Sequence, residues 1–422
     1  TNGRACNTVK VVSMDDPSDP SEVVVEEMAV GTHNEMHQQL PFALTPALPV
    51  GTTHLRAALN SIAMQIETGL PALPDVSYID ILTRRPPRTR SSKPLPRSGA
   101  DIADITAAVL DLDRSYVAVH GPPGCGKTHT AARVIATLLN DHGWRIGVVA
   151  QSHSVVENLL DEIAGDARGN PQRIGKKVKK TRARVWQAVK ENQYPAFIAQ
   201  DGGCVIGGTA WDFANLARVP PGSLDLLVIE EAGQFCLANT IAVAPTARNL
   251  LLLGDPQQLP QVSQGTHCEP VDQSALGWLV DGAPTLDPSL GYFLEQSWRM
   301  HPRVCKPVSN YSYGGRLESV EERTAARHLA GHEPGVHQIF VEHDGNSTDS
   351  AEEAERIVTE IRRLLGTQWT DEKGTRPLAQ SDVLVVAAYN AQVLMIRRHL
   401  KTAGLTRIQV GTVDKFQGKE AP

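Results

Sequence analysis

The chain has 422 residues, of which 41% are hydrophobic and 21% are charged, and its formal net charge is −6 at pH 7. This is the composition of a soluble globular protein, and the length is too great for one hydrophobic core, so two to four domains of about 100–200 residues are expected. The negative net charge excludes a polycation, so any contact with nucleic acid has to come from local basic segments.

Residues 1–98 are expected to form an N-terminal accessory region. Short β-branched runs within 1–49 predict strands of a small accessory domain, and residues 53–68 have apolar positions at helical spacing. Residues 84–97 hold six basic residues, four prolines and no acid. This composition favours a solvated, semi-rigid linker, and a grip on a nucleic-acid backbone is the alternative.

From residue 99 onward strands and helices alternate, which predicts a first α/β domain over 99–292. The apolar strands are uninterrupted and helices separate them, a pattern typical of a parallel sheet covered on both faces. The predicted strands are 115–120, 145–150, 204–208, 224–229 and 249–254.

The alternation resumes and predicts a second α/β domain over 293–422. Its expected elements are strands at 337–343, 382–389 and 407–413 and a helix at 350–366. The chain starts at Thr1 and stops at Pro422 soon after its last predicted strand, so we expect a fragment whose second domain is cut short.

Residues 121–128, GPPGCGKT, fit the phosphate-binding pattern G-x-x-x-x-G-K-[ST] between a predicted strand and a predicted helix. Glycines let backbone N–H groups turn toward phosphate oxygens, and the helix N-terminus adds partial positive charge. Lys127 would reach the outer phosphates, and Thr128 offers its hydroxyl to Mg²⁺. An incidental glycine-rich turn is the alternative. The residues expected at the nucleotide are Gly121, Gly124, Cys125, Gly126, Lys127, Thr128 and His129.

Two adjacent acids, Glu230 and Glu231, follow the apolar run 224–229. In P-loop proteins the acid at the strand end holds Mg²⁺, and the next acid can deprotonate the water that attacks the γ-phosphate. Glu230 is therefore predicted to be a metal ligand together with Thr128, and Glu231 to be the general base. A helix N-terminus that favours acids is the alternative interpretation.

Three more segments follow in the order found in helicases: GDPQQLPQV (254–262), QSWRMHP (296–302) and GTVDKFQGKE (411–420). With them the chain resembles superfamily 1 helicases of the 5′→3′ type, in the group of the nonsense-mediated-decay and Okazaki nuclease–helicase enzymes. The resemblance is closest to the helicase half of bacterial fusions with a RecB-like nuclease. It covers about 100–420 and implies two RecA-like P-loop domains that bind ATP between them.

The resemblance also implies roles for single residues. Gln258 would sense the γ-phosphate, and Asp255 would couple the nucleotide site to the strand track. Arg299 would be an arginine finger that reaches in from the second domain, so that Lys127, Glu231, Gln258 and Arg299 form the expected catalytic set. Two more residues are expected near the nucleotide, with Trp298 stacking on adenine or packing the seam between domains and Glu420 approaching the ribose.

Contacts to a nucleic-acid strand are expected where predicted strands end. Ser152 and His153 follow one strand, Thr209 follows another, Tyr389 takes the equivalent edge in the second domain, and the resemblance places Thr412 at a phosphate. Small hydroxyl groups suit phosphate contacts that position a strand without reading its sequence. For Ser152, Thr209 and Tyr389, ordinary helix caps or turn residues are the alternative.

An insert over 165–203 carries nine basic residues and no acid between Arg168 and Lys190. A solvated helical face is the usual meaning of such a run. Because the run lies between two segments expected to touch the strand, we predict a projecting basic helical insert that lies on nucleic acid. Its expected contacts are Lys176, Lys177, Lys179 and Lys180.

The predicted function is an ATP-dependent helicase or translocase on single-stranded nucleic acid, with DNA favoured and 5′→3′ polarity implied by the resemblance. ATP and Mg²⁺ are the expected cofactors, and single-stranded DNA or RNA and a RecB-like nuclease domain or subunit are the expected partners. An RNA helicase of the same group remains open. A P-loop kinase or GTPase would explain neither 254–260 nor 296–302.

Two departures from the family support a second hypothesis, an ATP-gated clamp or scaffold with weak hydrolysis. Glu230 stands where the family has Asp, and a sixth motif would lie beyond Pro422.

The six cysteines form no C-x-x-C pair, which indicates free thiols in a reducing compartment. No apolar run reaches the ~18 residues of a membrane span, and no signal peptide is recognised. We therefore predict a cytoplasmic protein without a membrane partner.

Overall fold

The computed structural model describes residues 8–14, 23–28, 50–166, 170–178, 184–260, 265, 267–416 and 420–421. The chain divides into two compact units, Gly51–Ala325 on the one hand and Thr1–Val50 with Ala326–Pro422 on the other. The domain bounds predicted from the sequence differ from these limits and stay predictions. Among the described residues, no helix is both long enough and apolar enough to cross a bilayer.

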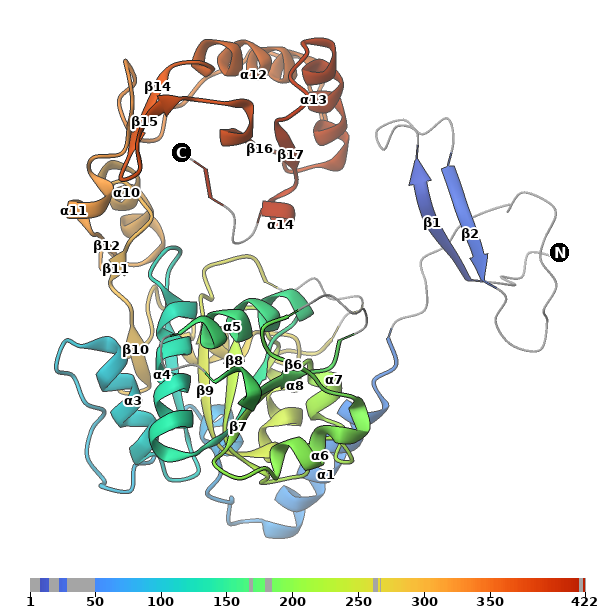
Figure 1. Ribbon diagram of the computed structural model, residues 1–422, viewed down its shortest axis with the longest axis vertical. Coiled ribbons are helices and arrows are strands. Elements are labelled where there is room, and N and C mark those ends of the chain that lie inside the picture. Colours follow the sequence, from blue (N-terminus) through green and yellow to red (C-terminus); the bar gives the residue numbers. More distant parts are fainter. Residues whose placement is uncertain are drawn as a thin grey trace. The chain divides into compact units, whose positions relative to one another are not determined.

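A sheet of eight strands forms the centre of the unit Gly51–Ala325, in the order β10-β3-β9-β8-β4-β7-β5-β6 (Figure 1). All neighbouring strands are parallel, as the uninterrupted apolar runs predicted. The strands are β3 (Tyr116–His120), β4 (Arg145–Val149), β5 (Ile174–Lys176), β6 (Gln187–Ala188), β7 (Cys204–Gly208), β8 (Leu224–Glu230), β9 (Ala247–Gly254) and β10 (Gly291–Phe293).

Helices cover both faces of this sheet, because successive side chains of each buried strand point to opposite faces. Tyr116 and Ala118 of β3 belong to one apolar core, and Val117 and Val119 to the other. The first face is covered by α1 (Thr53–Gly69), α2 (Ser77–Leu82), α6 (Tyr194–Ile198), α7 (Ala210–Phe213), α8 (Leu237–Val243) and α9 (Ala275–Val280). The second is covered by α3 (Asp101–Asp111), α4 (Lys127–His142) and α5 (His153–Gly165). The unit ends with β11 (Gln296–Ser297), α10 (Pro302–Ser312), β12 (Glu318–Ser319) and α11 (Glu321–Thr324).

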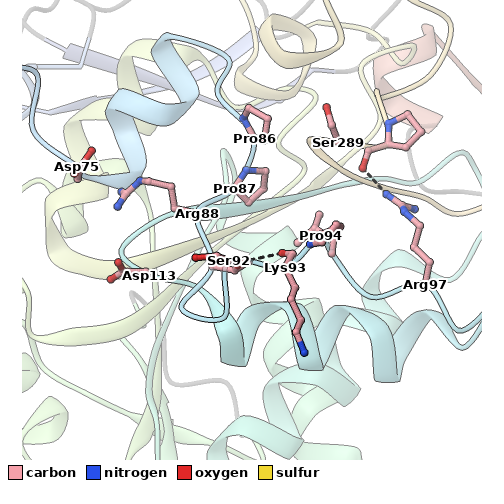
Figure 2. Close-up of a pocket in the computed structure, with 13 residues that line it drawn as sticks. Asp75, Pro86, Pro87, Arg88, Ser92, Lys93, Pro94, Arg97, Asp113 and Ser289 are labelled. Carbon is pink, nitrogen blue, oxygen red and sulfur yellow. Dashed lines mark hydrogen bonds between the residues drawn. The ribbon is translucent and has the colours of Figure 1, made fainter.

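Residues 84–97 are an ordered strap and not a free linker. Arg84 donates to the carbonyl of Trp278 at 2.7 Å, Arg88 pairs with the buried Asp80 at 3.0 Å, and Arg97 donates to the carbonyl of Gly291 at 2.7 Å. The strap lines an open pocket of about 630 Å³, and Figure 2 shows Arg88 and Arg97 among the residues that line it. Three of its guanidinium groups are bonded to other parts of the same unit, so the prediction of a solvated linker is corrected to an ordered strap.

The second unit contains a parallel pair, β16 (Leu384–Val386) and β17 (Gln409–Gly411), packed against two helices. Its other described elements are α12 (Ala351–Leu364), α13 (Asn390–Thr402), α14 (Val413–Phe416), the antiparallel strands β13 (His328–Leu329), β14 (Gln368–Asp371) and β15 (Gly374–Pro377), and the hairpin β1 (Thr8–Met14) with β2 (Val23–Met28). The predicted strand at 337–343 is wrong. That segment forms no strand with any of the residues that the structure describes, and Phe340 at its centre is 85% exposed.

The predicted projecting helical insert is also wrong for its described part, because β5 and β6 extend the central sheet beside β7. Lys176 is only 2% exposed and pairs with Glu157 of α5 at 2.9 Å, so it cannot lie on a nucleic-acid phosphate. Lys177 pairs with Glu191. Lys179 and Lys180 lie outside the described residues.

Replacing Lys176 with Met should lower stability by about 1–3 kcal/mol, because Glu157 then loses a buried cationic partner while keeping Arg184. Burial would raise the pKa of Glu157, but Lys176 and Arg184 hold it below its usual value. The pair therefore stabilises the fold above about pH 4.3, and the difference between wild type and variant should shrink as the pH falls below that value.

Urea unfolding measures this difference. Lys190→Met, at an exposed position of the same basic run, is the control and should leave stability nearly unchanged. A Lys176→Met protein of wild-type stability but with a flatter salt dependence of nucleic-acid binding would restore the original prediction.

Candidate functional site

The phosphate loop connects β3 to α4 at the carboxyl edge of the central sheet. Gly126 is the N-cap of α4 in a left-handed conformation, and Lys127 is the first helical residue. The α4 N-terminus thus opens onto the loop with its orphan N–H groups, a ready anion site. The Lys127 ammonium donates to the loop's own Gly121 carbonyl at 2.7 Å. Of the other loop residues, Cys125 is buried and His129 contacts Glu162.

Glu230 is the last residue of β8, and its carboxylate faces the phosphate loop. The Thr128 hydroxyl donates to Glu230 Oε1 at 3.1 Å. Glu230 is only 2% exposed, and its Oε2 atom is buried without a hydrogen-bond partner. Burial, with a smaller contribution from the Glu231 charge, raises the pKa of Glu230 to about 7, although Lys127 and Thr128 act in the opposite direction.

These two residues fit a divalent cation. Mg²⁺ prefers oxygen ligands, and Thr128 and Glu230 bring a hydroxyl and a carboxylate together at a helix N-terminus. A buried carboxylate oxygen without a partner is costly unless a cation or donor satisfies it. The predicted pairing of Thr128 with Glu230 is thus reproduced in geometry, and metal binding itself stays a prediction.

Glu231 starts a tight turn in a left-handed backbone conformation, with φ 55°. Such a conformation costs a residue with a side chain about 1–3 kcal/mol and needs support from its surroundings. The support comes from the neighbouring strand, since Ala232 N–H donates to the Leu253 carbonyl at 2.7 Å. A Cβ on Gly233 would lie 2.2 Å from the Asp255 carbonyl oxygen, so only glycine fits there. The turn therefore sets Glu231 beside Glu230 at the sheet edge.

The segment 296–301 packs directly on the phosphate loop. Trp298 N–H donates to the Gly124 carbonyl at 2.9 Å, and a Cβ on Gly124 would lie 2.4 Å from the Cβ of Arg299. Arg299 therefore belongs to the same compact unit as the phosphate loop, which differs from the expectation that it reaches in from a second domain. The Trp298 ring is 45% exposed, with the Arg323 guanidinium 5.4 Å from its centre.

Gln258 lies in the turn after β9 and donates to Asp255 Oδ2 at 3.1 Å. Two residues that sequence reasoning missed hold the same carboxylate: His120 and Tyr313. His120 could have been identified from the sequence as a polar residue that ends an otherwise apolar strand. No feature of the sequence identifies Tyr313, because it is close to Asp255 only in the folded chain.

The predicted nucleic-acid contacts lie where parallel strands end, but two of them cap helices. Ser152 accepts from Val155 N–H at 3.3 Å as the N-cap of α5, and Thr209 bonds to Asp212 at 3.0 Å as the N-cap of α7. The helix-cap alternative thus describes their present contacts, and their role at a strand stays a prediction.

The other residues predicted to contact the nucleic acid or the nucleotide lie in both units. His153 begins α5, next to the end of β4. In the other unit Tyr389 precedes α13 and is 56% exposed, Thr412 follows β17, and Glu420 is exposed.

Two family models match the chain, each described as an AAA domain, over residues 103–276 and 273–422. The DNA replication ATP-dependent helicase/nuclease DNA2 of Gallus gallus is 23% identical over 327 residues, which are 73% of this chain and 30% of that protein. The putative helicase mov-10-B.1 of Danio rerio is 25% identical, with 72% of this chain and 34% of that protein covered. The DNA-binding protein SMUBP-2 of Mesocricetus auratus is 23% identical, with 82% and 42% covered.

Among solved structures, the complex of Arterivirus nonstructural protein 10 (helicase) with DNA matches at 13% identity and a TM-score of 0.33, covering 72% of this chain and 61% of that one.

The fold and the loop 121–128 together define an α/β P-loop protein. Within that class, residues 103–276 and 273–422 match models of AAA domains, and the chain is similar to proteins named as ATP-dependent helicases, which agrees with the predicted resemblance to superfamily 1 helicases. The chain spans less than half the length of each curated relative named above.

Replacing Glu230 with Gln should remove most of the Mg²⁺-dependent gain in nucleotide affinity. The amide keeps the shape of the side chain but loses the charge that faces Thr128, and loss of even an outer-shell partner of a metal ligand typically costs about 10–100-fold in metal affinity. The measurement is the affinity of a non-hydrolysable ATP analogue with Mg²⁺ and with EDTA.

Asp225→Asn is the matched control, because Asp225 is the second residue of the same strand, near its opposite end, and accepts from Arg145 N–H at 2.9 Å. Full Mg²⁺ dependence in the Glu230→Gln protein would show that the metal is held elsewhere.

Proposed function

We propose that the chain is the motor part of an ATP-dependent helicase or translocase that acts on single-stranded nucleic acid. One observation supports this most: a single compact unit brings together the phosphate loop, the acids Glu230 and Glu231, the Gln258 turn and the Arg299 segment. A phosphate-binding protein without hydrolysis would need only the first of these. The other three are groups suited to a water nucleophile and to charge on a transferring phosphoryl group.

In this proposal the phosphates of ATP bind the N–H groups at the start of α4, and Lys127 leaves the Gly121 carbonyl for the outer phosphates. Thr128 and Glu230 would hold Mg²⁺, which would supply positive charge against the phosphates. Glu231 takes the proton of the attacking water, a contribution of about 10²–10⁴-fold in rate.

Gln258 and Arg299 then act on the transferring group. Gln258 contacts the γ-phosphate from the turn after β9, and Arg299 stabilises the charge of the transition state from beside Gly124. An arginine in that role contributes about 10³–10⁵-fold in phosphoryl transfer. Trp298, exposed next to the loop, stacks on the base.

Each unit contacts phosphates of the strand at its own strand ends: Ser152 and Thr209 follow β4 and β7 in one unit, and Tyr389 and Thr412 follow β16 and β17 in the other. We propose DNA as the substrate and 5′→3′ travel, supported by relatives named as DNA replication helicase/nucleases. The same names support a RecB-like nuclease domain or subunit as partner. The described cysteines are free thiols, which supports a cytoplasmic location.

The second candidate is an ATP-gated clamp that binds nucleic acid and barely hydrolyses ATP. The observation that favours it is Glu230, one methylene longer than the aspartate of the family, because Mg²⁺ tolerates distorted geometry poorly.

Single-stranded DNA should stimulate phosphate release by the wild-type protein, and Glu231→Gln should lower the stimulated rate by about 10²–10⁴-fold without weakening nucleotide binding. The readout is phosphate release with and without a single-stranded oligonucleotide. Asp225→Asn is the control and should keep the wild-type rate. Wild-type protein that binds ATP and DNA but shows no stimulation would favour the clamp.

Competition between DNA and RNA oligonucleotides of one sequence should favour DNA. Phosphate contacts serve both polymers, so discrimination has to come from the 2′-hydroxyl. Equal or tighter binding of RNA would replace the proposal with an RNA helicase of the same group.

A further inference from the structure

Three buried residues from separate parts of the unit Gly51–Ala325 meet beside the phosphate loop. His120 ends β3 directly before the loop, Asp255 follows β9, and Tyr313 follows α10. Their exposed fractions are 0%, 1% and 3%. His120 Nε2 lies 3.2 Å from Asp255 Oδ1, and the Tyr313 hydroxyl donates to Asp255 Oδ2 at 2.8 Å. We call these three residues the buried triad.

The hydrogen bonds around His120 determine which of its two ring nitrogens carries the proton. Leu286 N–H donates to His120 Nδ1 at 3.3 Å, and because a backbone N–H can only donate, Nδ1 carries no proton. The proton of the neutral ring therefore sits on Nε2 and is donated to Asp255. The His120 ring also packs edge-on against Phe293, with ring centres 5.0 Å apart.

Both oxygens of Asp255 are saturated. Oδ1 receives His120 and the N–H of Gln257 at 3.1 Å, while Oδ2 receives Tyr313 and the side-chain amide of Gln258 at 3.1 Å. Burial would raise the pKa of Asp255, but the bonds from His120 and Tyr313 and the charge of Lys127 hold it below its usual value. Four donors thus surround one buried anion.

Gln258 shares Oδ2 with Tyr313, so the orientation of its amide depends on where Tyr313 holds that oxygen. Tyr313 sits at the end of α10, whose N-cap is His301, two residues after Arg299. The phenol and Cys305 of α10 lie in one apolar cluster with Phe293. One carboxylate therefore joins the strand before the phosphate loop, the Gln258 turn and the helix that follows Arg299.

We infer that Tyr313 and His120 are positioning residues of the nucleotide site, which hold Asp255 so that Gln258 and the Arg299 segment respond together to the γ-phosphate. This inference rests on the proposed ATP hydrolysis. Neither side chain contacts the nucleotide in this scheme, and both act through Asp255.

Tyr313→Phe tests the inference, because it removes one hydrogen bond on Oδ2 and keeps the packed ring. The primary readout is the ratio of affinities for a non-hydrolysable ATP analogue and for ADP, which needs no hydrolysis. We expect Tyr313→Phe to lower this ratio about 5–10-fold, the coupling of roughly 1–1.4 kcal/mol typical of one hydrogen bond, with ADP affinity unchanged.

Tyr116→Phe is the matched control. Its hydroxyl is likewise buried and bonded once, to the Arg85 carbonyl at 2.9 Å, but it lies at the other end of β3. It should cost similar stability and leave the ratio unchanged. His120→Gln keeps a donor for Asp255 and should retain more of the ratio than His120→Leu.

A double-mutant cycle separates positioning from general destabilisation. In a Gln258→Ala background, Tyr313→Phe should have a smaller effect on the ratio, because the part of its action that runs through Gln258 is already removed. Additive effects, an unchanged ratio in Tyr313→Phe, or an equal loss in Tyr116→Phe would each overturn the inference. Absence of phosphate release by the wild-type protein would instead overturn the proposed function, and the affinity ratio would still decide the role of Tyr313.

Discussion

The close approach of two turns, one after β8 and one after β9, is the constraint on which the rest of the site depends. Gly233 lies against the Asp255 backbone with no space for a Cβ, and Gly121 N–H donates to the Gly254 carbonyl at 2.8 Å. The parallel order β3-β9-β8 brings all three strand ends to one edge. A side chain at 233 would separate the acids from the Gln258 turn, and the left-handed backbone of Glu231 would lose the contact that supports it.

Three unfavourable features meet at this edge of the sheet, and a bound ligand could relieve them. Glu230 is buried with one oxygen unbonded, Lys127 is turned onto its own loop, and Glu231 is held in a strained conformation. An unsatisfied buried acceptor costs about 1–3 kcal/mol, and the backbone strain costs a similar amount. The apolar strands and the two helical layers offset these costs, because β3, β8 and β9 are almost entirely buried. The fold therefore stabilises a site that is unfavourable by itself and that, under the proposed function, would become favourable with a cation and phosphates.

Most of the central sheet could be predicted from the sequence, because a strand buried on both faces needs an apolar run and the runs at 224–229 and 249–254 have no other explanation. The phosphate loop was equally predictable from its glycines and lysine. The runs of basic residues led to wrong predictions. A count of the basic side chains around Lys176 does not include Glu157 of α5, which neutralises Lys176 in the folded chain. The prediction of a solvated linker over 84–97 failed for the same reason, because Asp80 and backbone carbonyls bind the arginines of this strap. Tyr313 could not be predicted, because no local pattern places it beside Asp255.

The structure also changes the meaning of the glutamate pair. One extra methylene shifts a carboxylate by about 1.5 Å, and a displacement of ~1 Å can cost ~10²-fold in rate, which made Glu230 the weak point of a hydrolytic site. Yet Glu230 stays in the ladder of β8 opposite Leu253, and its carboxylate meets the Thr128 hydroxyl at 3.1 Å. The longer acid thus reaches the hydroxyl of the loop while its own backbone remains paired in the sheet. Under the proposed function, what separates a motor from a clamp then depends on Glu231, whose orientation is set by a strained turn, and on Gln258, whose amide is held by the buried triad.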